Sequence, residues 1–170
     1  MEITYGVCSV VEGNKHVTIW DFDAIPKDEV QFVFNKLQEI QVEYGLPTIY
    51  VFKSSETEGS VHLTALSLTK RDFRTVFTIA ARTPRVDPDF LLLSARNGYF
   101  TLRIGPKRCQ AIKLVKVLES NFPDEASIDN LNLWVIYVVR EYYVPTDTHP
   151  SPPLRELMKR EFKALIAGDV

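Results

Sequence analysis

Two aspartates one residue apart, Asp21 and Asp23, follow an apolar run in the first part of the chain. In a β-strand alternate side chains share a face, so these carboxylates project together while Trp20 and Phe22 point to the other side. Such a pair is suited to a hard divalent cation, and without one its mutual repulsion raises the pKa of one member. The alternative is two unrelated acids at a strand end, where aspartate is common in turns and helix caps.

The basic residues of the chain are concentrated in its middle. Residues 53–116 carry 12 Lys or Arg and 5 Asp or Glu, whereas residues 1–52 carry 3 and 8, and residues 117–170 carry 5 and 9. A basic middle between acidic flanks fits a phosphate-binding face beside a carboxylate site, although ordinary solvated surfaces produce the same bias.

Length and composition indicate one soluble domain. The chain has 170 residues, of which 45% are hydrophobic and 25% are charged. No apolar run reaches the roughly 18 residues of a membrane span, and the N-terminus lacks the pattern of a signal peptide, so we expect a cytoplasmic protein without a membrane partner. Cys8 and Cys109 are isolated and are expected to be buried packing residues.

The carboxylate pair is expected to lie between a hairpin and a helix. Runs rich in β-branched residues at 3–11 and 16–22 flank turn residues and predict a hairpin. Apolar residues at helical spacing then predict a helix over 30–44, ended by Gly45 and Pro47.

The rest of the chain predicts further strands and two more helices. In a strand at 60–67, Ser60, His62 and Thr64 share one face. The short apolar runs at 112–118 and 131–139 fit helix or strand equally. The other expected elements are a strand at 48–53, a helix at 70–82 capped by Thr69, a hairpin of strands at 90–95 and 99–104 around Asn97-Gly98, and a final helix over 154–165. This order favours an α+β fold with a mainly antiparallel sheet and helices packed on it.

The spacing of the chemical residues resembles the three motifs of the archaeo-eukaryotic primase superfamily. The motifs are an Asp-x-Asp pair, a small residue two before a His on a later strand, and an acid after a hydrophobic residue. They match Asp21-Phe22-Asp23, Ser60-Val61-His62 and Val86-Asp87. The segment from Thr101 to Lys107 is similar to one common after the third motif in plasmid and viral members, so the resemblance covers about residues 17–107.

The resemblance implies a minimal primase-polymerase catalytic core, RRM-like in fold, over residues 1–110, with residues 111–170 as a C-terminal extension packed on it. The implied reaction is template-directed nucleotidyl transfer from nucleoside triphosphates on a single-stranded nucleic-acid template, with a possible replication-protein partner. Two ions of Mg²⁺ or Mn²⁺ would support it. The implied metal ligands are Asp21, Asp23 and Asp87, with Asp89 as a competitor for the third place. Ser60, His62, Arg103 and Lys107 would contact the nucleotide phosphates, and Lys53, Arg71, Arg74, Arg82 and Arg85 the template backbone.

Three other classes of protein remain open. A haloacid dehalogenase-like phosphatase also opens its site with Asp-x-Asp, but it requires a doubly wound parallel sheet. A replication-initiator endonuclease needs a His-x-His metal site, and no two histidines here have that spacing. A non-catalytic nucleic-acid-binding or protein-interaction domain would instead present aromatic residues such as Tyr50 and Tyr99 beside the central basic residues.

Overall fold

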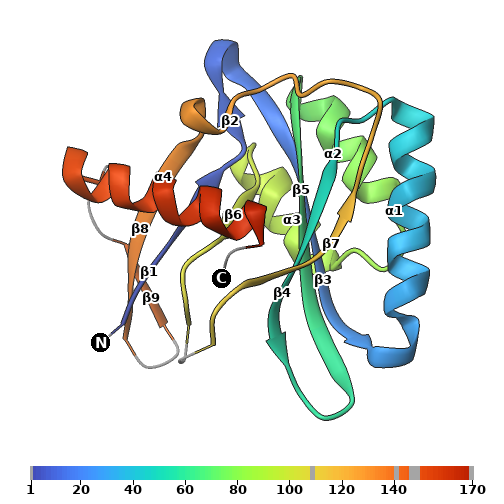
Figure 1. Ribbon diagram of the computed structural model, residues 1–170, viewed down its shortest axis with the longest axis horizontal. Helices are drawn as coiled ribbons and strands as arrows, with labels where there is room; N and C mark the ends of the chain where they lie inside the picture. The colour runs from blue at the N-terminus through green and yellow to red at the C-terminus, as the bar shows by residue number, and fades with distance from the viewer. Residues whose placement is uncertain (1, 108–109, 140–141, 146–149, 169–170) are drawn as a thin grey trace.

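The computed structural model describes residues 2–107, 110–139, 142–145 and 150–168. In these residues the chain forms antiparallel β-sheets and α-helices (Figure 1). The strands are β1 (Glu2–Cys8), β2 (Val10–Val11), β3 (Lys15–Pro26), β4 (Ile49–Glu56), β5 (Ser60–Arg71), β6 (Thr101–Arg103), β7 (Lys113–Leu118), β8 (Asn132–Val139) and β9 (Tyr142–Pro145). The helices are α1 (Val30–Tyr44), α2 (Phe73–Arg82), α3 (Pro88–Asn97) and α4 (Pro152–Ala167). The expected α+β class with antiparallel sheets is confirmed.

The larger sheet has the strand order β2-β3-β5-β4-β7. β5 is antiparallel to both β3 and β4, so β3 and β4 run in the same direction and are joined by α1. The smaller sheet has the order β6-β1-β8-β9. The two runs that fitted helix or strand, 112–118 and 131–139, are thus strands β7 and β8, one in each sheet.

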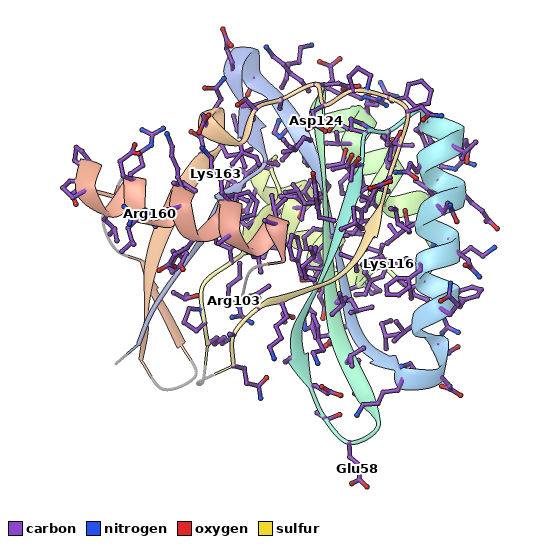
Figure 2. The ribbon with its side chains drawn as sticks, viewed as in Figure 1. Glu58, Arg103, Lys116, Asp124, Arg160 and Lys163 are labelled. Carbon is purple, nitrogen blue, oxygen red and sulfur yellow. The ribbon has the colours of Figure 1, made fainter. Side chains whose placement is uncertain are left out.

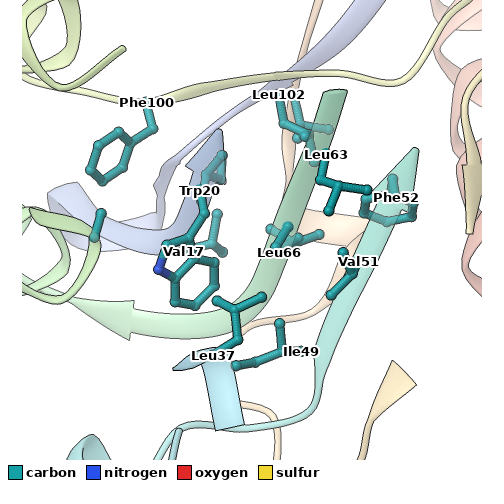
Figure 3. Packing of buried hydrophobic residues seen from close by; sticks show 14 of the residues in the cluster. Val17, Trp20, Leu37, Ile49, Val51, Phe52, Leu63, Leu66, Phe100 and Leu102 are labelled. Carbon is teal, nitrogen blue, oxygen red and sulfur yellow. The ribbon is translucent and has the colours of Figure 1, made fainter. Parts of the chain in front are cut away.

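Fully buried apolar side chains from the larger sheet and α1 form much of the core (Figure 3). Trp20 on β3 and Leu37 on α1 have no exposed surface, and the indole N–H of Trp20 donates to the hydroxyl of Thr83 at 2.9 Å. Helix α1 ends where expected, because Gly45 adopts the left-handed conformation with φ 60° and its N–H bonds the carbonyls of Gln41 and Val42.

The predicted hairpin of strands at 90–95 and 99–104 is wrong. Residues 90–95 belong to helix α3, which Asp87 caps and Pro88 begins. Gly98 with φ 78° is the left-handed cap at the end of this helix, so Asn97-Gly98 ends a helix and does not turn a hairpin. Only Thr101–Arg103 of the second predicted strand is a strand, β6.

The N-terminal hairpin is also wrong in its pairing. β1 pairs with β6 and β8 in the smaller sheet, and only the two residues of β2 pair with the start of β3. The helix expected from residue 70 begins three residues later, since β5 continues to Arg71 and Thr69 is a buried strand residue whose hydroxyl donates to the carbonyl of His16. The strands at 48–53 and 60–67 and the helices at 30–44 and 154–165 are confirmed.

Two expectations concern membranes and cysteines. Among the described helices, none is long and apolar enough to cross a membrane. Cys8 is half-buried, and burial raises the pKa of its thiol. Cys109 lies outside the described residues.

Candidate functional site

Asp21 and Asp23 lie on β3 where its pairing with β5 changes register. Asp21 stands directly opposite Thr64. Between Phe22 and Ile25, β3 uses one more residue than β5, which defines a β-bulge around Asp23. The bulge changes the direction of the strand at Asp23. The side chain of Asp23 is 64% exposed, whereas that of Asp21 is 26% exposed.

His62 bridges the two carboxylates from β5. Its Nε2 lies 2.5 Å from Oδ1 of Asp21, and its Nδ1 lies 3.6 Å from Oδ1 of Asp23. Burial lowers the pKa of His62, but the hydrogen bond to Asp21 and the charges of both aspartates outweigh burial, and the net shift is upward. The imidazolium form of His62 is therefore favoured between the two acids.

Asp87 brings a third carboxylate to the pair. It caps the N-terminus of α3, where its side chain accepts from the backbone N–H of Asp89 at 3.0 Å. Its own backbone N–H donates to the carbonyl of Asp21 at 2.8 Å, which ties the start of α3 to β3. The pKa of Asp87 is raised, first by burial and then by repulsion from Asp21, Asp89 and Asp23. Asp89 itself is exposed in the first turn of the helix.

Arg103 reaches the same region from the smaller sheet. It ends β6, and its guanidinium donates to the carbonyl of Gly105 at 2.6 Å and to that of Ser54 on β4 at 3.3 Å. Its charge acts on His62, where it opposes the upward shift of the pKa. Arg103 is thus a cation within electrostatic range of the carboxylate site.

Ser60 and Lys107 are the other two residues that we expected at the nucleotide phosphates. Ser60 begins β5 two residues before His62, and its hydroxyl lies 3.0 Å from that of Thr57 in the hairpin turn. Lys107 follows β6, where its backbone forms two hydrogen bonds with Gln110. Glu58 projects from the tip of the β4–β5 hairpin, away from the body of the protein (Figure 2).

Most of the basic residues expected on the template are engaged by acids of the same chain. Those ion pairs are Lys53 with Glu56, Arg71 with Glu125, Arg82 with Glu43, and Arg85 with Glu29. Glu56 also pairs with Lys27, and hydrogen bonds from the two lysines lower the pKa of this carboxyl to about 2. Acidic side chains of the same chain therefore neutralise part of the positive charge of residues 53–116.

The carboxylates of Asp21, Asp23 and Asp87 are the type of ligand that a hard divalent cation takes, but their present arrangement is not a metal site. Among the described residues, no three His, Cys, Asp or Glu side chains are placed so that they could hold a metal ion as they stand. His62 instead lies between Asp21 and Asp23, with a ring nitrogen facing each carboxylate. Carboxylate oxygens are the ligands that Mg²⁺ and Mn²⁺ take, and a dication would relieve the repulsion that contributes to the raised pKa of Asp87.

Two further polar groups were not singled out by the sequence. Ser9 and His16 form a buried pair, with the Ser9 hydroxyl 2.8 Å from Nδ1 of His16, but both are nearly solvent-free and Ser9 also accepts from the N–H of Phe100. This pair is structural. The hydroxyl of Thr64, opposite Asp21, is buried without a hydrogen-bond partner. The shared face of residues 60, 62 and 64 was the only signal in the sequence that pointed to it.

No protein-family model, no curated protein and no solved structure matched this chain when it was compared with known proteins.

Proposed function

We propose that this protein is a nucleotidyltransferase of the primase-polymerase type, acting on a single-stranded nucleic-acid template. The observation that carries the proposal is the convergence of Asp21 and Asp23 from β3, His62 from β5 and Asp87 from the start of α3. These residues are the motif positions through which the sequence resembles the archaeo-eukaryotic primase superfamily. The order β3-α1-β4-β5-α2, with β5 between β3 and β4, supports the RRM-like core that the resemblance implies.

In this proposal Asp21, Asp23 and Asp87 hold Mg²⁺ or Mn²⁺. When bound, the ions activate the attacking 3′-hydroxyl and neutralise charge on the triphosphate. His62 turns its N–H from Asp21 to a phosphate oxygen of the incoming nucleotide, since a charged imidazole forms strong hydrogen bonds with phosphate. Arg103 adds positive charge beside it, and Ser60 and Lys107 are the further phosphate contacts of this proposal.

A second candidate is a non-catalytic binding domain of a replication system. Leu92 and Leu93 on α3 are 70% and 56% exposed, only a few residues after Asp87. Adjacent exposed leucines favour contact with another macromolecule. A phosphatase of the haloacid dehalogenase kind is less favoured, because β3, which carries the aspartates, pairs antiparallel with β5.

Incorporation of a labelled nucleotide on a primed single-stranded template, with Mn²⁺ or Mg²⁺, tests the proposal. We expect the wild type to extend the primer, and Asp23→Asn to abolish extension while its thermal unfolding temperature stays within a few degrees. Asp28→Asn is the matched control, because Asp28 is an exposed acid in the short 3₁₀ turn after β3.

The rival functions give different results in the same set of proteins. Metal-dependent release of phosphate from an aryl phosphate, lost in Asp21→Asn, would indicate the phosphatase. A salt-dependent shift of single-stranded DNA that is unchanged in Asp23→Asn, with no incorporation by the wild type, would indicate the binding domain.

A further inference from the structure

The hydroxyl of Thr64 is an unpaired polar group within the larger sheet. Thr64 is 7% exposed, and its Oγ1 has no hydrogen-bond partner. The other buried hydroxyls on β3, β4 and β5 all form hydrogen bonds. They belong to Thr18, Ser54, Ser67 and Thr69. A buried hydroxyl without a partner destabilises a fold, so its presence calls for an explanation.

The position of Thr64 places this hydroxyl beside the carboxylate site. Thr64 is the direct cross-strand partner of Asp21 and lies two residues after His62 on the same face of β5. Side chains directly opposite on antiparallel strands have Cβ atoms about 4.5–5.5 Å apart, a separation that a hydroxyl can bridge to a carboxylate when the side chain adopts a suitable rotamer.

Asp21 has an oxygen to accept this hydrogen bond. His62 is bonded to Oδ1 of Asp21, and Oδ2 of the same carboxylate is the second acceptor that the hydroxyl of Thr64 would use. Carboxylates that bind metal ions are usually held in place by hydrogen bonds from neighbouring groups, and loss of such a neighbour weakens metal binding.

We propose that Thr64 is a positioning residue for Asp21. When a divalent cation takes the place of His62 at the carboxylates, the hydroxyl of Thr64 donates to Asp21 and fixes the orientation of its carboxylate. The hydroxyl of Thr64 is thus unpaired in the metal-free protein and forms its hydrogen bond in the cation-bound state. This role rests on the cation site of the proposed function, but it concerns a residue that the family motifs do not include.

A second unpaired hydroxyl provides a matched control. Thr4 on β1 is also buried, and its Oγ1 also lacks a partner, but it lies in the smaller sheet opposite Ile136. Thr64→Val and Thr4→Val each replace an unpaired buried hydroxyl by a methyl group of similar size. Both variants should therefore unfold at the same temperature as the wild type or higher.

Mn²⁺ binding to the full chain, followed by calorimetry and by electron paramagnetic resonance, separates the two positions. We expect Thr64→Val to weaken Mn²⁺ binding by roughly 10- to 100-fold, while Thr4→Val and Thr64→Ser bind as the wild type does. Rescue by serine would show that the hydroxyl is required. Thr64→Ala provides the same comparison if the valine variant does not fold.

Two results would overturn the positioning role. If Thr64→Val binds Mn²⁺ as tightly as the wild type, or if Thr4→Val weakens binding equally, Thr64 does not position Asp21, and the proposed function is untouched. If the wild type itself binds no Mn²⁺, the cation site and the role of Thr64 fail together.

Discussion

Substitution of Asp87 separates its two roles, as the cap of α3 and as the third acid of the site. Asn caps a helix about as well as Asp, so Asp87→Asn keeps the hydrogen bond with the N–H of Asp89. It removes a carboxylate that is partly buried and repelled by its neighbours, which are the causes of its raised pKa. Asp87→Asn should therefore stabilise the metal-free protein, whereas Asp87→Ala also loses the cap.

The expected magnitudes are small but measurable. Partly exposed charges interact by about 0.5 kcal/mol, so the free energy of unfolding of Asp87→Asn should rise by about that amount at neutral pH. A protein of this length then gains about 1–2 °C in unfolding temperature. Asp87→Ala should be about 1 kcal/mol less stable than Asp87→Asn, because that is the typical contribution of an N-cap.

The pH dependence of stability is a second test of whether the Asp87 carboxylate destabilises the metal-free protein. A carboxyl with a raised pKa in the folded state takes up its proton first as the pH falls, so its destabilising effect shrinks through that range. The advantage of Asp87→Asn should therefore disappear as the pH falls below the unfolded value of about 4. Urea denaturation at pH ~7 and ~3, with Mn²⁺ binding of the same proteins at neutral pH, tests the reasoning. A loss of stability in Asp87→Asn at neutral pH, or unchanged Mn²⁺ affinity, would refute it.

Three further predictions concern histidine ionisation and sheet packing. The stability that the wild type holds over His62→Gln should be present in full below pH ~6.5 and decline as the pH rises through the raised pKa of His62, measured by urea denaturation across pH. His16 should act in the opposite direction, because burial lowers its pKa, so the wild type should lose stability relative to His16→Gln as the pH falls below ~6.5. Gly105→Ala should lower the free energy of unfolding by roughly 1–3 kcal/mol. The added Cβ would lie 2.7 Å from the ring of Tyr5 and 2.9 Å from its backbone nitrogen. An unchanged unfolding temperature would contradict this packing.

The sequence predicted the elements whose signals are local. Helix α1 has both an apolar stripe and a glycine cap, and both were found. Helix α3 was not predicted, because Asn97-Gly98 suits a hairpin turn and a helix end equally, and the start signal of the helix lies in Asp87-Pro88-Asp89, a segment that its prolines make look irregular. The pairing of β1 with β8 joins residues more than a hundred apart, which periodicity does not encode.

The sequence indicated which acidic residues and which histidine lie near one another, but not how their side chains are oriented and paired. The shared face of Asp21 and Asp23 follows from strand alternation, and the motif spacing added His62 and Asp87. The bulge after Asp21, which re-aims Asp23 beside His62, has no clear sequence signal. The unpaired hydroxyl of Thr64 depends on the register of β3 and β5, so only the structure reveals it.

Binding of a nucleoside triphosphate with and without Mn²⁺, measured by calorimetry for the wild type and the double variant Asp21→Asn/Asp23→Asn, tests the central claim most directly. We predict that the wild type binds the triphosphate only when Mn²⁺ is present, that the double variant loses this binding, and that Asp28→Asn keeps it. Triphosphate binding that ignores both the metal and the two aspartates, or no binding at all by a folded wild type, would contradict the nucleotidyltransferase proposal.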